Sequence, residues 1–383
     1  MTFASDRAAE GSPSRAHQEP ELPDSLLFKD DWADARPRLE AWWHGHVIDR
    51  VALAVTAPRE ETLAGYPEAA PEPDDVYRFW TDLEWRLTRA EATLARTHYL
   101  GEAFPYFAPL FGPGSMALYL GSEPTLDKET VWYNPTLDSL AEPPALRFDP
   151  ENPWWRLNRD FAFRAVERGR GKYLVTHPDI IENLDVLASL RGAQCLLLDL
   201  VEHPESIHAG LAQVNDLYFR YFDELYAPIE SATPGGGCAS LFRVWGPGKV
   251  AKVQCDLAAL ISPRMFRDFV VPYLAEQCDR LDYAVYHLDG PQAMVHVEAL
   301  REIPSLHAIQ WTPGAAYPGV GSPEWYDLYR KIKRGGKSCL ILGAEPEEVE
   351  PLVRAVGPEE LLISTEADSR AEGEDLLAGA KTW

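Results

Sequence analysis

The chain reads Ala284-Val-Tyr-His-Leu-Asp-Gly-Pro-Gln-Ala-Met-Val-His296 at the point that is most informative about its fold. An apolar run at residues 283–286 leads directly into His287, Asp289 and Gly290, as when a buried parallel strand ends at a functional loop. On an extended backbone His287 and Asp289 leave the same face of the strand, because they are two residues apart. The pair therefore suits a metal ion or acid–base chemistry, and the structural alternative is a histidine that only caps a neighbouring loop.

The chain around this segment alternates short apolar runs with helical stretches. Alternation of this kind favours a parallel sheet, and eight strands favour a closed (β/α)8 TIM barrel. An open doubly wound sheet would alternate in the same way, but a Gly-rich phosphate loop usually follows its first strand, and Val55-Thr-Ala-Pro-Arg-Glu60 stands there instead. The predicted strands include residues 51–56, 172–176, 251–253, 284–286, 308–310, 339–342 and 361–364, with the clearest helices at 263–280 and 323–335.

Two segments are expected to lie outside the repeating pattern. Residues 1–24 are polar and predict a disordered N-terminal tail, which leaves residues 25–383 as one barrel domain. Residues 122–157 hold several tryptophans among many prolines and are too long for an ordinary connection. We therefore expect them to form an insertion folded over the barrel mouth.

Two helices are predicted before the second strand. Residues 74–99 read as one long amphipathic helix that opens with two aspartates, as the helix dipole prefers. Residues 33–44 form the other helix, and its Trp42-Trp43 pair is expected to pack at the barrel bottom or against the partner in a homodimer.

Composition narrows the function classes. A net charge of -24 argues against binding nucleic acid or anionic membranes, because both need clustered Lys and Arg. The five cysteines form no CxxC pair, which indicates reduced thiols in an intracellular protein. The first 24 residues lack the apolar core of a signal peptide, and no apolar run reaches the roughly 20 residues that span a bilayer. We therefore expect a cytoplasmic protein.

The segment ending at His296 also resembles a known family when it is taken with Ile261-Ser-Pro-Arg-Met-Phe-Arg-Asp-Phe-Val-Val-Pro-Tyr-Leu274 just upstream. Together they resemble the uroporphyrinogen decarboxylase superfamily, which includes zinc-dependent, corrinoid-linked methyltransferases. Similar stretches at residues 47–55 and 190–204 extend the resemblance over roughly residues 36–375. The resemblance implies a (β/α)8 barrel with its site at the C-terminal ends of the strands.

The chain departs from the family in two places. The decarboxylase branch carries an Arg-Gln-Ala-Gly-Arg signature near its start, and nothing like it follows Arg50, so tetrapyrrole decarboxylation is not expected. The methyltransferase branch has a His-x-Cys zinc motif and a further cysteine after the last strand. Here Asp289 takes the first cysteine position, and Leu361-Leu-Ile-Ser-Thr-Glu-Ala-Asp-Ser369 contains no cysteine. A His/carboxylate site with a different metal preference is what remains.

Residues just past the strands of such a barrel converge on one mouth. We predict His287, Asp289 and Glu366 as catalytic residues and, if a divalent metal binds, as its ligands. One nitrogen and two oxygens favour zinc, manganese or iron, and occupancy should fall below about pH 6.5, where His287 becomes protonated. The candidates for binding a small-molecule substrate are Glu102, Tyr106, His177, Asn183, Trp245, Gln254, Gln310 and Trp311. Other polar residues that follow strands are Asp179, Glu182, Asp185, Asp256 and Glu345, of which Asp179 and Glu182 also fit a helix capping box.

Three functions are compatible with these residues. The resemblance implies a methyltransferase, in which a metal at His287 and Asp289 activates the acceptor. No Asp-x-His-x-x-Gly motif is evident, so a corrinoid would be carried by a separate protein. The residues themselves equally suit a carboxylate-pair enzyme, a hydrolase or lyase acting on a sugar or polyol through Asp289 and Glu366. The third alternative is a non-catalytic barrel that binds a small molecule.

Overall fold

The central feature of the fold is a curved sheet whose strands are mostly parallel. The computed structural model describes residues 23–66, 68, 70–233, 236–239 and 241–383. Seven strands are hydrogen-bonded in the order β2-β1-β13-β12-β11-β10-β9, and all neighbours in this sheet are parallel except β1 and β2. Their bounds are β1 (Ala52–Pro58), β2 (Thr97–Gly101), β9 (Val250–Gln254), β10 (Tyr283–Asp289), β11 (Ala308–Thr312), β12 (Ser338–Leu342) and β13 (Leu361–Glu366).

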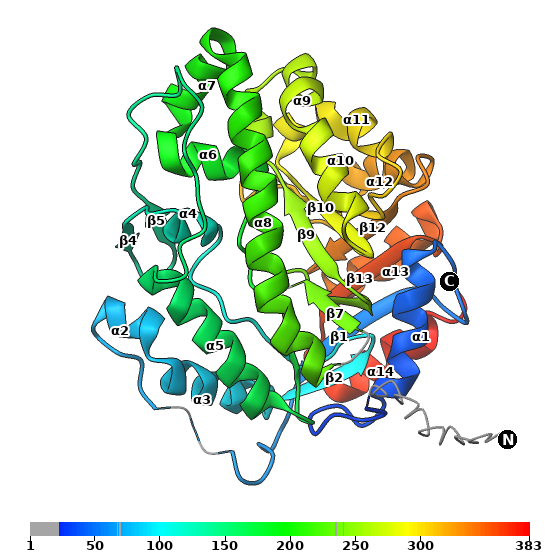
Figure 1. Cartoon of the computed structure of the whole chain (residues 1–383). Coiled ribbons are helices and arrows are strands. Elements are labelled where there is room, and N and C mark those ends of the chain that lie inside the picture. The colour runs from blue at the N-terminus through cyan, green and yellow to red at the C-terminus, as the bar shows by residue number, and fades with distance from the viewer. Residues whose placement is uncertain (1–22, 67, 69, 234–235, 240) are drawn as a thin grey trace, which may run out of the picture.

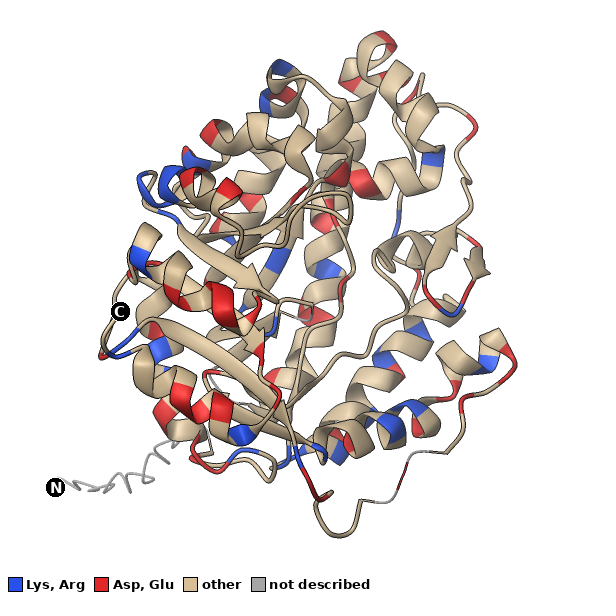
Figure 2. Ribbon diagram, turned by 180° about the vertical axis from the view of Figure 1, so that it is seen from behind, with Lys and Arg blue, Asp and Glu red and all other residues tan. Residues whose placement is uncertain are grey.

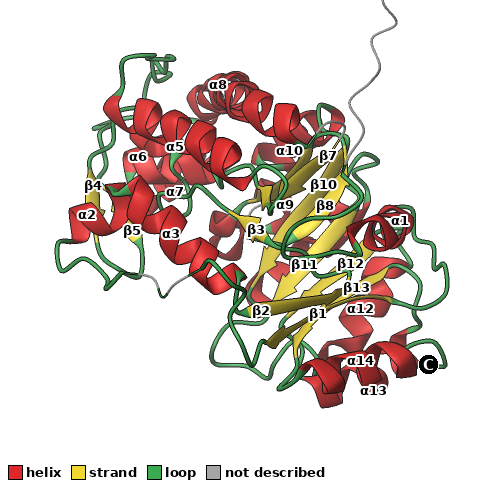
Figure 3. Ribbon diagram, turned by 90° about the horizontal axis from the view of Figure 1, so that it is seen from below, coloured by secondary structure: helices red, strands yellow, loops and turns green. Residues whose placement is uncertain are grey.

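Shorter strands continue the curve of this sheet (Figure 3). β3 (Tyr106–Phe107) pairs in parallel with β6 (Leu174–Val175), and a parallel bridge between His177 and Ala239 joins β6 to β7 (Gly236–Ala239). β7 forms an antiparallel hairpin with β8 (Val244–Pro247), and the chain then turns into β9. Among the described residues the ladder of hydrogen bonds is interrupted between β2 and β3 and between β7 and β9. The expected α/β fold with a parallel sheet is confirmed, and its arrangement is that of a TIM-like barrel whose ladder is not closed.

Helices cover the outside of the sheet, and a further helical layer lies on one side of it (Figure 1). The long helix α8 packs between the strands and this layer, where it contacts α5, α6 and α7. The β4–β5 hairpin, of Pro124–Leu126 and Val131–Tyr133, belongs to the same layer. The helices are α1 (Trp32–Trp43), α2 (Val76–Thr81), α3 (Leu83–Leu94), α4 (Met116–Tyr119), α5 (Pro153–Gly169), α6 (Asn183–Arg191), α7 (Ala193–Glu202), α8 (Pro204–Ala232), α9 (Pro263–Phe269), α10 (Val271–Asp279), α11 (Val297–Arg301), α12 (Tyr326–Lys333), α13 (Pro346–Val356) and α14 (Arg370–Gly379).

Strand residues alternate between two apolar cores, because successive side chains face opposite sides of a sheet. In β10, Val285 belongs to an inner cluster within the curve of the sheet, whereas Tyr286 packs into the outer core beneath the helices. The inner cluster is closed at the N-terminal ends of the strands by α1. There Trp42 donates to the carbonyl oxygen of Cys339 at 3.3 Å, and Trp43 donates to that of Trp245 at 2.9 Å. The Trp42-Trp43 pair therefore packs at the barrel bottom, and the homodimer stays a prediction.

The prediction of one helix over residues 74–99 is wrong. The structure has two helices, α2 and α3, followed by strand β2. The break lies at Asp82, whose ψ of 87° is not helical and whose carboxylate accepts the backbone N–H of Trp85 at 3.1 Å. An N-cap residue can end one helix and begin the next while the apolar residues keep their helical spacing. The spacing alone therefore does not reveal the break.

The long segment at residues 122–157 is partly ordered into secondary structure. It contains the β4–β5 hairpin, and Lys128 and Glu129 in the hairpin turn line a cavity at the C-terminal ends of β1 and β13. The predicted disorder of residues 1–24 falls almost wholly on residues 1–22, which lie outside the described residues. Within the part of the chain that the structure describes, every helix is too short or too polar to cross a membrane.

Candidate functional site

Three polar side chains form one row across neighbouring strands at the barrel mouth. The strand register pairs Gln254 of β9 with His287 of β10, and His287 with Gln310 of β11. Register partners in parallel strands point to the same face, and here that face is the inner one, because Val285, two residues before His287, lies in the inner cluster. The row therefore points into the mouth.

The hydrogen bonds of this row fix the tautomer of His287. Its Nδ1 lies 2.5 Å from Oε1 of Gln310, and the amide nitrogen of Gln310 donates to the carbonyl oxygen of Trp311 at 2.7 Å and to Oγ1 of Thr312 at 2.9 Å. Because the amide nitrogen of Gln310 is used in this way, the amide oxygen faces the imidazole. That oxygen accepts a hydrogen bond from the N–H at Nδ1 of His287. Nε2 of His287 is then left with a lone pair. An amide or carboxylate on the other ring nitrogen is the usual support for a metal-binding histidine.

Two carboxylates complete a cluster with His287. Asp256, His287 and Asp289 each offer one ligand atom, and these atoms all lie within 4.8 Å of one another. Asp289 is the last residue of β10, and Asp256 stands just after β9 at the start of a 3₁₀ turn, so both carboxylates come from strand ends. We call these three residues the mouth triad.

The donor set of the mouth triad fits a divalent metal. One imidazole nitrogen and two carboxylate oxygens suit zinc, manganese or iron, and three protein ligands leave positions open for a substrate. Ligand atoms around zinc lie at about 2.1 Å from the metal, so binding would require the three side chains to close by about an ångström. Asp256 and Asp289 are solvent-exposed and have the freedom to do so.

Behind the mouth triad lies a buried lysine. Nζ of Lys252, on β9, is 2.8 Å from Oδ1 of Asp179, and it also donates to the side-chain oxygen of Gln254. Burial alone would lower the pKa of Lys252, but the carboxylates of Asp179 and Glu182 outweigh it and raise that pKa. Burial and the charge of Lys252 lower the pKa of His287, which keeps the imidazole neutral at physiological pH. Metal occupancy should therefore persist below the pH of about 6.5 that the free side chain predicts.

Excess negative charge is a second property of this region. Asp179, Glu182, Asp185 and the two carboxylates of the triad outnumber Lys252. Burial raises the pKa of Glu182 well above its ordinary value, and burial together with Asp256 raises that of Asp185 to about 6. Acids that are held together in this way retain protons or bind a further cation.

Glu366 lies at the mouth but away from the triad. It is the last residue of β13, and the strands β11 and β12 separate β13 from β10. Its carboxylate lines a cavity of about 920 Å³ between the mouth and α2–α3, together with Tyr106 and Thr56. We call this space the mouth cavity. The third member of the group with His287 and Asp289 is thus Asp256, and a role for Glu366 in the chemistry stays a prediction.

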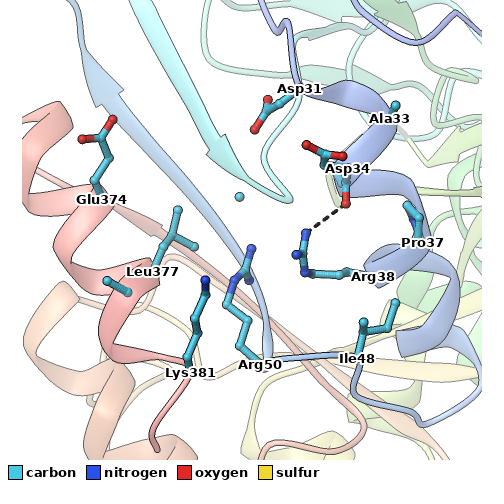
Figure 4. A pocket seen from close by; sticks show the side chains of 13 residues that line it. Asp31, Ala33, Asp34, Pro37, Arg38, Ile48, Arg50, Glu374, Leu377 and Lys381 are labelled. Atoms are coloured by element: carbon cyan, nitrogen blue, oxygen red, sulfur yellow. Dashed lines mark hydrogen bonds between the residues drawn. The ribbon is translucent and has the colours of Figure 1, made fainter.

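Glu102 is placed at the opposite end of the barrel. It follows β2, which is antiparallel to β1, and so it lies near the N-terminal end of β1. The carboxylate is fully buried and makes a two-pronged ion pair with Arg50, with contacts of 2.5 and 2.9 Å, and it also accepts the backbone N–H of Leu53. Arg50 also lines a separate cavity of about 550 Å³ at this end, with Arg38 and Lys381 among its other walls (Figure 4). The geometry assigns Glu102 to holding β1 and β2 together rather than to substrate.

Neither tryptophan predicted to bind substrate faces the mouth. Trp311 is fully buried beneath the helices against Trp325, with ring centroids 5.1 Å apart, because it follows the inward-facing Gln310 by one residue. Trp245 packs edge-on against Trp32 of α1 at 5.5 Å, near the barrel bottom. Both are core residues.

Of the remaining candidates, His177, Asn183 and Gln254 are buried and Tyr106 is half-buried. His177 stacks on Phe222 with ring centroids 4.0 Å apart, and burial lowers its pKa to about 4, so it is neutral. Asn183 has a positive φ of 55° and donates to the side chain of Gln277 at 3.0 Å. Gln254 donates to Asp256 at 3.0 Å and so supports the triad, and Tyr106 lines the mouth cavity.

Comparison with known proteins supports the fold. No protein-family model matches the chain, and no curated protein matches it. Among solved structures, a methyltransferase from Methanosarcina mazei is similar over 91% of this chain and 98% of its own, with a TM-score of 0.57 and 12% sequence identity. At that identity the likeness concerns the fold.

Proposed function

We propose that this chain is a barrel enzyme that transfers a methyl group to or from a small molecule, with a divalent metal held by Asp256, His287 and Asp289. The observation that supports it best is the mouth triad, whose ligand atoms lie within 4.8 Å of one another at strand ends. The similarity of the whole fold to a methyltransferase supports the transferase part of the proposal. The proposal has two further parts: residues 25–383 form a closed (β/α)8 barrel, and the chain belongs to the uroporphyrinogen decarboxylase superfamily.

The residues around the triad would each do part of this work. Gln310 holds the proton on Nδ1 of His287 and so presents Nε2 as a ligand. Gln254 orients Asp256, and burial together with the charge of Lys252 lowers the pKa of His287 and keeps it neutral. A bound metal would lower the pKa of an acceptor group and generate a nucleophile at neutral pH. The methyl donor that the family resemblance implies is a corrinoid carried on a separate protein.

A carboxylate-pair enzyme acting on a sugar or polyol is the second candidate. One observation favours it: the pKa of Asp185 is raised to about 6, beside the carboxylate of Asp256. Burial also raises the pKa of Asp256, and a carboxyl group whose pKa is raised toward neutral pH can hold a proton for general acid catalysis. In this alternative the pair is Asp185 and Asp256, since Asp289 and Glu366 stand on strands that are not neighbours.

Metal analysis separates the two candidates. We expect the purified protein to retain about one ion per chain after dialysis against zinc, manganese or iron(II). Elemental analysis by mass spectrometry measures this stoichiometry. Asp256→Asn and Asp289→Asn should each weaken binding at least tenfold, as loss of a ligand does. Glu366→Gln is the matched control, which removes a carboxylate from the same mouth and should leave the stoichiometry unchanged. Wild-type protein that retains no ion would rule out the metal and leave the carboxylate pair.

A further inference from the structure

The mouth cavity is lined by more basic than acidic side chains. Its basic residues come from α3, the short connection between α3 and β2, the turn of the β4–β5 hairpin and the turn between β7 and β8, and its acidic ones are Glu129 and Glu366. The whole chain has a net charge of -24, so positive charge collected in one concave surface stands out from its surroundings. Such a surface attracts anions. The basic residues are Arg86, Arg89, Arg96, Lys128 and Arg243.

Three of these five already have carboxylate partners at the rim. Arg89 and Lys128 both pair with Glu72, at 2.7 and 2.9 Å, and Arg96 pairs with Glu68 at 3.0 Å. Arg86 and Arg243 form no ion pair with any residue that the structure describes. The positive charge that is free to bind a ligand is therefore on Arg86 and Arg243.

Arg86 is held in place by contacts that leave most of its donors unused. Its Nη1 donates to the carbonyl oxygen of Trp80 at 3.1 Å, and its guanidinium lies over the rings of Phe161, at 4.7 Å, and Phe111, at 5.5 Å. A guanidinium has five N–H donors, and among the described residues the bond to Trp80 is the one hydrogen bond that the side chain of Arg86 makes, so other donors remain that could meet an anion. Burial lowers the pKa of Arg86 to about 9, which still leaves it charged at neutral pH. Placing a charge in such surroundings without a counter-ion is costly, and a bound anion would offset that cost.

Arg243 reaches the mouth cavity from a different element. It is the last residue of the turn between β7 and β8 and has a φ of 52°, in the left-handed region that residues with a side chain seldom adopt. Backbone strain of this kind occurs often at ligand-binding sites. The two arginines thus line one cavity from two separate parts of the chain, and guanidinium groups are the side chains that best match a carboxylate or phosphate.

Much of the remaining wall is apolar or aromatic. Phe79 and Trp80 of α2, Trp85 and Leu94 of α3, and Leu110 all line the cavity. Rings and aliphatic side chains at this density bind an apolar body, while a few charged groups fix its orientation. Figure 2 shows basic positions along α3, the helix that supplies Arg86.

We propose that the mouth cavity binds an organic anion, a carboxylate or phosphate monoester with an aromatic or aliphatic body, between Arg86 and Arg243. The binding itself needs no metal; that this anion is the substrate of the mouth triad rests on the proposed function. The turn that carries Arg243 connects the two places, because the ring of Phe242 lies 5.4 Å from that of His287. An anion held by Arg243 would thus lie next to Phe242, the residue of the turn whose ring is near His287 of the triad.

Calorimetric titration of the full chain, freed of metal with a chelator, tests the binding directly. The probes are benzoate and phenyl phosphate, with benzamide and phenol as neutral compounds of similar shape. We expect one of the two anions, or both, to bind at least tenfold more tightly than its neutral counterpart, which corresponds to about 1.4 kcal/mol. The better of the two anions identifies the headgroup. Neutral compounds that bind as tightly as the anions would overturn the proposal.

Three variants locate the site. Arg243→Asn removes the charge and keeps a residue that tolerates positive φ, and Arg86→Gln removes the other guanidinium. Each should raise the Kd of the preferred anion at least tenfold. Arg89→Gln is the matched control, since it removes the same charge one helical turn from Arg86 but from a residue already paired with Glu72. An equal loss in all three variants, or no loss in Arg243→Asn, would contradict the proposal; if Arg86→Gln does not fold, Arg243→Asn decides.

The outcome is independent of the metal. Asp289→Asn should bind the preferred anion with the same Kd as the wild type, even though it fails to retain a metal. Anion binding with no metal would leave this inference standing and remove the metal site, and the reverse result would remove this inference alone.

Discussion

At the scale of single residues, the mouth combines side chains that the sequence identifies with others that only the fold brings in. His287 and Asp289 could be predicted together because a spacing of two on a strand fixes a shared face. Asp256 was recognisable as a polar residue after a strand, but its place beside His287 depends on the register between β9 and β10. Trp311 does not line the mouth, because it follows Gln310 by one residue and the alternation of a strand turns its side chain to the opposite face.

Asp185 gives the clearest pH-dependent prediction at this scale. Burial and Asp256 raise its pKa in the folded protein to about 6, above the unfolded value, so its contribution to stability is full below about pH 3.8 and is lost as the pH rises through about 6. The loss has an upper limit of about 3 kcal/mol, since each pKa unit is about 1.4 kcal/mol. Urea unfolding should show that the free energy of unfolding of the wild type, relative to Asp185→Asn, decreases between pH 4 and pH 7.

The hydrogen bonds that Asp185 accepts from the backbone of Asp256 and Leu257 do not disturb this test. Their loss in the variant shifts both ends of the curve by a similar amount, so only the slope reports the ionisation. Asp375→Asn, at an exposed position of α14, serves as the control. Parallel curves for the wild type and Asp185→Asn would show that Asp185 is ionised throughout this range.

At the scale of elements, strands were easier to predict than helix boundaries. The apolar runs at 51–56, 284–286 and 361–364 became β1, β10 and β13 with similar bounds, because strands covered on both faces are continuous apolar runs. The division between α2 and α3 was missed because both helices keep one apolar face.

Asp82 is the residue that divides the two helices, and its replacement should have a measurable cost. Asp82→Ala removes the carboxylate that caps α3, so we expect the free energy of unfolding to fall by about 1 kcal/mol. Asp82→Asn keeps a capping oxygen and should cost much less, which also controls for the exposed ion pair between Asp82 and Arg78. Chemical denaturation of the three proteins makes the comparison. Equal losses in both variants would attribute the effect to charge rather than to the cap.

At the scale of the whole molecule, the two ends of the barrel have different tasks. The N-terminal end holds the Arg50–Glu102 pair and the tryptophans of α1, and the C-terminal end holds the mouth triad and the mouth cavity. Barrel enzymes generally separate stability and chemistry in this way. The sequence predicted the mostly parallel α/β fold, but it could not assign Glu102 to the lower end, because a strand that runs antiparallel to its neighbour reverses which end of the barrel its last residue reaches.

This division predicts opposite effects for two acidic residues. Glu102→Gln leaves Arg50 buried without its counter-charge, so the free energy of unfolding should fall by about 3–5 kcal/mol while metal stoichiometry stays unchanged in the folded fraction. Asp289→Ala should change stability by no more than about 0.5 kcal/mol and abolish both metal retention and turnover. Urea titration and elemental analysis of the two variants measure both quantities. A large destabilisation in Asp289→Ala with retained turnover would make Asp289 a structural residue.

The turn between β7 and β8 has a consequence for how the two ligands would influence each other. Phe242 contacts the His287 ring, and the neighbouring Leu241 and Arg243 line the mouth cavity, so one short backbone segment is shared by both places. A ligand that shifts this segment acts on the other site through it. Thermodynamic linkage then requires reciprocity: by whatever factor the anion changes the affinity for the metal, the metal changes the affinity for the anion by the same factor.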